Sequence, residues 1–321
     1  MKKFSIADSV FKVNLKYAKL QNKSKELFFR CLQEDRSVEY FKAELEALWG
    51  INDMTYLEEQ IFEYQAYLHE KNTNKKLDKT KTTIAGLAAL AVIPKTNKLF
   101  TKVKEKEYIL RIESLGYKTN KDEYLKKLVP KYTSDVKAYR NAQNEVVRFV
   151  KPSTYNSMVY NTTLTRNGWV QTLNDGDDMG IGYYYIPSHN FSCIHCAEHQ
   201  NIAMSKEQCM RLLGTADDGA EELLHPNCKC ELTFYNPNLV LDSTINREQI
   251  EREYDIRQQV NALTIRKEEI LSDIRIQKEL GNQDEVDRLN QQRNKINSSI
   301  KELQNELPTD ELRKQVVAIN R

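Results

Sequence analysis

Five of the six cysteines lie between residues 193 and 230, together with three of the five histidines. Cys193 and Cys196 have the spacing C-x2-C, which lets two thiolates reach one metal ion from a tight turn. About thirty residues later, Cys228 and Cys230 have the spacing C-x-C, so that both side chains point to the same side of an extended strand. Zinc binds four such ligands in a tetrahedron. The two pairs therefore predict a zinc site.

The sequence HPNCKC offers more than one way to complete this site. His225 and Cys228 repeat the two-residue gap of the first pair, whereas Cys228 and Cys230 form a pair on one strand face. Either pair supplies the two missing ligands of a tetrahedral zinc ion. The spacing leaves this choice open.

Disulfides are the main alternative use of the clustered cysteines. The N-terminal sequence MKKFSIADSVFKVNLKYAKL lacks the apolar core of a signal peptide, so we expect a reducing compartment. In such a compartment, clusters of Cys and His bind metals more often than they form disulfides. Two disulfides would also leave one of the five cysteines unpaired.

A catalytic metal is a further alternative. His195 and His199 are four residues apart with Glu198 between them, but the order H-C-A-E-H differs from the H-E-x-x-H of zinc proteases. HCAEH and PNCKC also depart from the signature of zinc deaminases. The pattern therefore favours a structural zinc ion, and an enzyme remains the competing hypothesis.

Composition predicts a helix-rich chain without a membrane span. The 321 residues, of which 29% are charged and 40% hydrophobic, indicate two domains or one domain with extensions. Only 10 Gly and 7 Pro argue against an all-β fold. The longest apolar stretch, Thr83–Pro94, is too short to cross a bilayer, and we expect a buried helix or an interface there.

Residues 1–150 are expected to form a helical region whose second half is basic. Val38, Phe41, Leu45 and Leu48 recur at helical spacing, with Ser37 as a predicted N-cap and Gly50 as a predicted stop. From Lys71 to Lys151 there are 20 Lys and Arg against 8 Asp and Glu. This excess indicates either a solvated face or contact with a nucleic-acid backbone or an acidic partner.

Residues 151–242 are expected to form a small α+β core around the cysteines. GIGYYYIP, Gly180–Pro187, reads as a strand that enters the cluster, and CELTFYNP, Cys230–Pro237, as a strand that leaves it. SKEQCMRLLG, Ser205–Gly214, reads as a short capped helix. Because this segment has little apolar mass, we expect zinc to hold it together.

Residues 243–321 are expected to form charged helices. Gly281 and Asn282 interrupt two heptad-like seams, the second of which ends at Pro308. Asn282 is a predicted N-cap, with Glu285 completing a capping box. The short interruption favours an antiparallel helical hairpin; a coiled-coil arm that pairs with another copy is the alternative. The seam residues are Ile256, Val260, Leu263, Ile270, Ile274, Val286, Leu289, Ile296, Ile300, Leu303 and Leu307.

The sequence SHNFSCIHCAEHQ resembles a segment of the minor capsid proteins of tailed bacteriophages. That segment reads roughly S-x-H, six residues, His or Cys, Ala, two residues and Gln, and the matching positions are His189, Cys196, Ala197 and Gln200. PNCKCELTFYNP resembles a later motif, N-C-[RK]-[HC] followed by an aromatic residue and a proline, matched by Asn227, Cys228, Lys229 and Cys230.

HPNCKC is also similar to the H-P-N-C-R-C of head-morphogenesis proteins from Mu-like phages, which carry a C-x2-C upstream. Cys193 and Cys196 match that pair. The minor capsid motif often has His at the position of Cys230 and a basic residue near Cys193, so the chain combines features of both groups. On this resemblance His189 is a further candidate ligand. The candidate ligands are Cys193, Cys196, His225, Cys228, Cys230 and His189.

The resemblance covers about residues 180–300 and implies a structural role in the virion. A minor capsid or head-morphogenesis protein would contact the portal or the major capsid protein, in the host cytoplasm during assembly and then in the virion. Lys71–Lys151 would touch packaged DNA, and the C-terminal helices would self-associate. The alternatives are a phage-delivered zinc-dependent nuclease or toxin-like effector, and a DNA-binding adaptor.

Overall fold

The computed structural model describes most of the residues of the chain. These are residues 4, 6–50, 53–78, 90, 92–133, 137–140, 146–213, 228–241, 244, 246–309 and 312–313. His225 lies outside them, as do residues 83–89 and 91 of the apolar stretch Thr83–Pro94. No helix in the described ranges is both long enough and apolar enough to span a bilayer.

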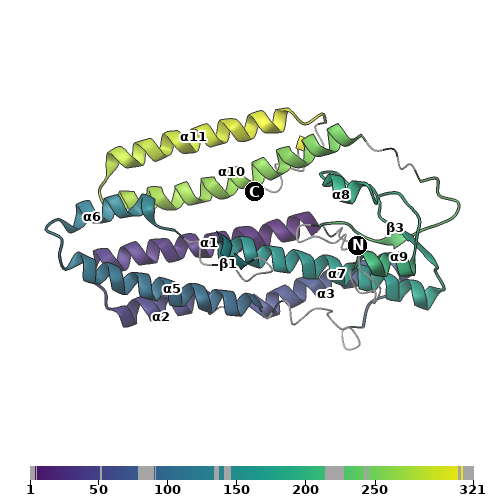
Figure 1. Ribbon diagram of the computed structural model, residues 1–321, viewed down its shortest axis with the longest axis horizontal. Coiled ribbons are helices and arrows are strands. Elements are labelled where there is room, and N and C mark those ends of the chain that lie inside the picture. Colours follow the sequence, from purple (N-terminus) through teal and green to yellow (C-terminus); the bar gives the residue numbers. More distant parts are fainter. Residues whose placement is uncertain are drawn as a thin grey trace. The chain divides into compact units, whose positions relative to one another are not determined.

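The fold is mainly helical, as composition predicted, with short strands between the helices (Figure 1). In chain order the elements are α1 (Ile6–Gln33), α2 (Val38–Trp49), α3 (Asp53–Thr73), α5 (Val92–Leu115), α6 (Lys121–Leu128), the 3-10 turn η2 (Val129–Lys131), β1 (Lys137–Arg140), β2 (Val146–Val150), α7 (Pro152–Met179), β3 (Tyr183–Tyr185), α8 (Ile194–Ala197), β4 (Met204–Ser205), α9 (Lys206–Leu212), β5 (Thr233–Phe234), α10 (Arg247–Glu279) and α11 (Gln283–Asn305).

The elements form two compact units, each built from several chain segments. Unit 1 comprises Met1–Phe11, Asp53–Ala91 and Met158–Gln258, and unit 2 comprises Lys12–Asn52, Val92–Ser157 and Gln259–Arg321. The three consecutive segments expected from the sequence, 1–150, 151–242 and 243–321, stay a prediction. Helices α1, α7 and α10 each contribute residues to both compact units.

Unit 2 has an aromatic core. The ring of Phe41 stacks on Tyr108 with centroids 4.2 Å apart, and Phe28 meets both rings edge-on. Helix α2 begins as predicted, because the Ser37 side chain accepts a hydrogen bond from the backbone N–H of Tyr40. It also ends as predicted, at Gly50. Capping and helical spacing therefore located this helix correctly.

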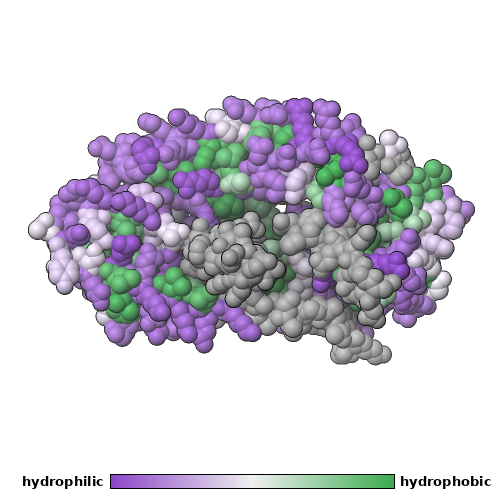
Figure 2. Space-filling model, viewed as in Figure 1, coloured by the Kyte–Doolittle hydropathy of each residue, from purple (hydrophilic) through white to green (hydrophobic). Residues whose placement is uncertain are grey.

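The C-terminal helices α10 and α11 form the predicted hairpin within unit 2, where they lie side by side (Figure 1). Ile270 and Ile274 pack against Val286 and Leu289 close to the turn. The predicted capping box is wrong, because the Asn282 side chain donates to the Gln277 side chain instead of accepting from α11. The outer side of the hairpin is mostly hydrophilic (Figure 2). Pairing with another copy stays a prediction.

One part of the expected helical region 1–150 is not helical. Strands β1 and β2 form an antiparallel pair with a register shift between Tyr139 and Arg140. The sequence of β2, VVRFV, is rich in β-branched and aromatic residues, which favour strands. The expectation of helix up to residue 150 is therefore corrected for this segment.

Unit 1 contains a small antiparallel sheet with the strand order β4-β3-β5. Strands β3 and β5 lie inside the two segments predicted to enter and leave the cysteine cluster. Helix α9 has a complete capping box, in which Ser205 and Gln208 each bind the other's backbone N–H. The buried cluster around the cysteines combines Trp169 and Leu173 of α7 with residues of β3, β4 and α9.

Candidate metal centre

The second half of the cysteine cluster lies on an extended segment whose burial alternates. Cys228, Cys230 and Leu232 are buried, whereas Lys229 and Glu231 between them are half-buried. Alternate side chains of an extended chain point to the same side. The C-x-C spacing therefore presents both thiols to one side, as the sequence predicted.

Helix α7 holds this segment through its backbone. Asn161 and Thr165 both donate hydrogen bonds to the carbonyl oxygen of Cys228, at 3.0 Å each. The Trp169 indole N–H donates to the carbonyl of Cys230 at 2.8 Å. One turn further, the Thr172 hydroxyl donates to the carbonyl of Leu232 at 3.3 Å.

The four donor side chains lie along one face of α7. The carbonyl groups that accept from them belong to alternate residues of the extended segment, Cys228, Cys230 and Leu232. Buried hydroxyl and amide groups are costly unless they are hydrogen-bonded, so the partners explain a polar helix face inside a core. The polar face of α7 thus fixes the register and orientation of the segment that carries Cys228 and Cys230.

The first half of the cluster lies on the short helix α8. Cys193 is its N-cap, and its sulfur accepts a hydrogen bond from the backbone N–H of Cys196 at 3.4 Å. Cys196 is buried, whereas Cys193 is half-buried. The C-x2-C turn thus directs Cys196 into the core of unit 1.

A strained loop leads into α8. Phe191 has a φ of 61°, a left-handed conformation that costs a residue with a side chain about 1–2 kcal/mol. Its ring is buried, and the Arg257 guanidinium lies 4.8 Å from the ring centroid. This packing offsets the strain and fixes the turn that precedes Cys193.

The same loop orients His189. Its Nδ1 lies 3.1 Å from the carbonyl oxygen of Asn190. Because a carbonyl only accepts, this contact places the proton on Nδ1 and leaves the lone pair of Nε2 available. Ser192 donates to the backbone carbonyl of His189, and Gln200 in turn donates to Ser192, both at 2.7 Å.

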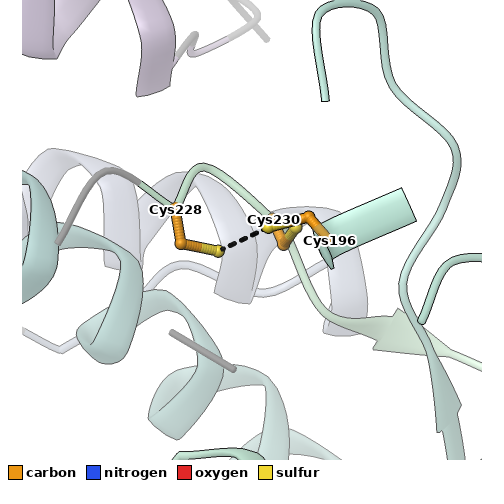
Figure 3. A group of neighbouring side chains, drawn as sticks. All are labelled: Cys196, Cys228 and Cys230. Carbon is orange, nitrogen blue, oxygen red and sulfur yellow. Dashed lines mark hydrogen bonds between the residues drawn. The ribbon is translucent and has the colours of Figure 1, made fainter. Parts of the chain in front are cut away.

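Three sulfur atoms converge in the core. The Sγ atoms of Cys196, Cys228 and Cys230 all lie within 4.8 Å of one another, and those of Cys196 and Cys228 are 3.6 Å apart. Figure 3 shows that the three side chains come from α8 and from the extended segment and point toward one another. All six cysteines are free thiols. The group can hold a metal ion.

His189 lies at the edge of this group. Its Nε2 is 3.5 Å from the Sγ of Cys230. A tetrahedral zinc ion with bonds of about 2.3 Å to sulfur and about 2.0 Å to nitrogen would separate two sulfurs by about 3.8 Å, and sulfur from nitrogen by about 3.5 Å. The separations of 3.6 Å and 3.5 Å match two edges of such a tetrahedron, and the ligand atoms that all lie within 4.8 Å of one another are the three sulfurs.

Hydrogen bonding and burial determine whether the Cys196 thiol and the His189 imidazole carry a proton when no metal is bound. Hydrogen bonding to Cys193 and Cys228, together with burial, raises the pKa of the Cys196 thiol far above its ordinary value. Burial lowers the pKa of His189, which keeps its imidazole neutral. A metal would therefore displace thiol protons and find a neutral imidazole.

The six predicted ligands thus divide into three groups. Cys196, Cys228 and Cys230 come together, and His189 adjoins them. Cys193 contacts Cys196 twice, because its sulfur accepts from the backbone N–H of Cys196 and its side chain also hydrogen-bonds to the Cys196 thiol. His225 lies outside the described residues.

The residues of the catalytic alternative make other contacts. Glu198 forms an ion pair with Arg247 at 2.6 Å, and Nδ1 of His199 lies 3.0 Å from the carbonyl oxygen of His195. His195 is exposed. These contacts do not aim Glu198 or His199 at the sulfurs.

Comparison with known proteins does not assign the chain to a family. No family model, no curated protein and no solved structure matches the chain.

Proposed function

We propose that this chain is a minor capsid or head-morphogenesis protein of a tailed bacteriophage, with a structural zinc ion in unit 1. The proposed ligands are Cys196, Cys228, Cys230 and His189. The phage role rests on the resemblance of SHNFSCIHCAEHQ and PNCKC to motifs of that family. The metal rests on the geometry of the four side chains.

The observation that carries the metal proposal is the convergence of three buried sulfurs within 4.8 Å of one another, with the His189 Nε2 3.5 Å from the sulfur of Cys230. Three buried thiols and a neutral imidazole are the ligand types that zinc prefers. Four protein ligands close the coordination sphere, which is typical of structural sites; catalytic zinc keeps a position open. This favours a structural role over a nuclease or toxin-like activity.

Bound zinc would join the turn at α8 to the extended segment after residue 228. Structural zinc in small domains contributes about 10–16 kcal/mol of apparent binding free energy, which adds directly to folding. The ion would therefore stabilise a unit whose sheet is too small to do so alone. The helices of unit 2, including the hairpin of α10 and α11, would remain available for contacts with the portal, the capsid or another copy.

Two measurements test the proposal separately. Metal analysis of the purified chain should give one zinc per chain, and the Cys228→Ser variant should give none. Co-expression with the portal and major capsid proteins of the same phage should yield a complex that co-purifies and enters assembled heads. Stoichiometric zinc without such a complex would overturn the capsid role and keep the metal centre.

A matched variant separates the structural from the catalytic hypothesis. Glu198→Gln removes the carboxylate that a zinc hydrolase would need as a general base, but it leaves all four proposed ligands in place. On our proposal, zinc content and assembly are unchanged. A loss of head assembly in this variant, with zinc retained and the fold intact, would contradict a purely structural centre.

A further inference from the structure

Unit 2 contains a polar cavity that the metal centre and the capsid role leave unexplained. Its volume is about 410 Å³, within the range of small-molecule sites, and α1, the segment around η2, residue 151, α10 and α11 all line it. A cavity of this size with charged walls fits a polar ligand.

The charged groups in the wall are unequal in number. Among the described residues that line the cavity, four cationic side chains face three carboxylates, and the seven are Lys25, Lys151, Arg266, Arg288, Asp273, Glu269 and Glu285. Lys25 pairs with Asp273, and Arg288 pairs with Glu285. Each of these two pairs is neutral.

The surplus positive charge is confined to one corner. Lys151 and Arg266 both bind the single carboxylate of Glu269, Arg266 through Nη1 at 3.0 Å. Two cations therefore share one anion. A guanidinium has five N–H donors, and one of those of Arg266 is used here, so most of its donors face solvent or a ligand.

We infer that this cavity binds a small oxyanion of the phosphate class at the corner formed by Lys151 and Arg266. An arginine fork and a lysine are the side chains that bind phosphate oxygens most effectively. The Glu269 carboxylate would compete with the anion for both cations. Removing the charge of Arg266 should therefore weaken phosphate binding, and removing the charge of Glu269 should strengthen it.

The test is isothermal titration of the full chain with inorganic phosphate at constant ionic strength. Wild-type protein should bind one phosphate per chain. Arg266→Gln should weaken binding about tenfold or more, whereas Glu269→Gln should strengthen it. Arg266 is 55% exposed, so its replacement leaves the core intact. The matched control is Arg275→Gln in the same helix, because Arg275 is 51% exposed and pairs with Glu26 outside the cavity.

Three outcomes would overturn the inference. These are the absence of saturable phosphate binding, equal losses in Arg266→Gln and Arg275→Gln, and a weaker affinity in Glu269→Gln with an unchanged melting temperature. A parallel titration with pyrophosphate shows whether the cavity prefers a single phosphate or the diphosphate of a nucleotide. None of these results depends on zinc, so the metal proposal is tested separately.

Discussion

At the scale of single residues, the metal centre depends on groups that never touch the metal. Thr165 and Asn161 fix the carbonyl of Cys228, and Trp169 fixes that of Cys230. The cysteine spacing identified the thiols, but these three contacts join residues more than sixty positions apart. No local pattern encodes such a pairing, so the sequence could not reveal them.

His189 shows a second limit of predicting the metal ligands from the sequence. The spacing of possible metal ligands suggested His225 and did not suggest His189. The family resemblance instead indicated His189 and Gln200. In the fold, Gln200 reaches the His189 loop through Ser192, and the imidazole lies 3.5 Å from the sulfur of Cys230. The left-handed turn at Phe191 makes this approach possible, and its conformation was not evident from the sequence.

Thr165→Val should weaken zinc binding about tenfold, because it removes one donor to the Cys228 carbonyl while keeping the side-chain shape. The measurement is competition with a chromophoric zinc chelator. Thr163→Val is the control, since its buried hydroxyl donates to the Val159 carbonyl within its own helix. Equal affinities for the two variants would refute the positioning role of Thr165.

At the scale of elements, two serine N-caps and apolar periodicity located helices correctly, whereas the capping box at Asn282 was wrong and the polar helix α7 was missed. Ser37 and Ser205 marked the starts of α2 and α9 correctly. Helix α7 was not anticipated, because its 28 residues are rich in Asn, Thr and Gly, which favour other conformations in isolation. Its polar residues are used in tertiary hydrogen bonds, which override the local preference.

Close packing of α7 against the sheet gives a second prediction. A Cβ added at Gly176 would lie 2.1 Å from the Tyr184 hydroxyl oxygen, whereas one at Gly182 would meet nothing within 4 Å. Gly176→Ala should therefore destabilise the protein by about 1–3 kcal/mol through overpacking. Gly182→Ala should change stability by less than about 0.5 kcal/mol.

Urea unfolding followed by circular dichroism measures both variants. If the two glycine variants unfold at the same urea concentration, Gly176 is not in close contact with Tyr184. A larger loss for Gly176→Ala, together with unchanged zinc affinity, would show that packing and metal binding are separable on α7.

At the scale of the whole molecule, the chain is divided differently from its sequence blocks. Composition separated a basic segment, a cysteine-rich segment and a charged C-terminal segment. The compact units instead draw on three segments each, because the long helices α1, α7 and α10 pass from one unit to the other. Such long-range association is not encoded in composition or in periodicity.

The location of the cysteines predicts where metal removal acts. All four proposed ligands belong to unit 1, and the hairpin core of α10 and α11 belongs to unit 2. Strong chelator should therefore increase amide hydrogen exchange first in β3, α8 and the extended segment that carries Cys228 and Cys230. Exchange in α11 should change little. If the chelator increased exchange equally in both units, or in neither, a metal that stabilises unit 1 locally would be ruled out.

We propose that the zinc ion in unit 1 is bound by three sulfurs and one imidazole nitrogen. X-ray absorption at the zinc edge of the purified chain distinguishes these ligands, because sulfur and nitrogen give different bond lengths. We expect three sulfurs at about 2.3 Å and one nitrogen at about 2.0 Å, with the nitrogen lost in His189→Ala. Four sulfurs, or a nitrogen that persists in His189→Ala, would show that His189 is not a ligand.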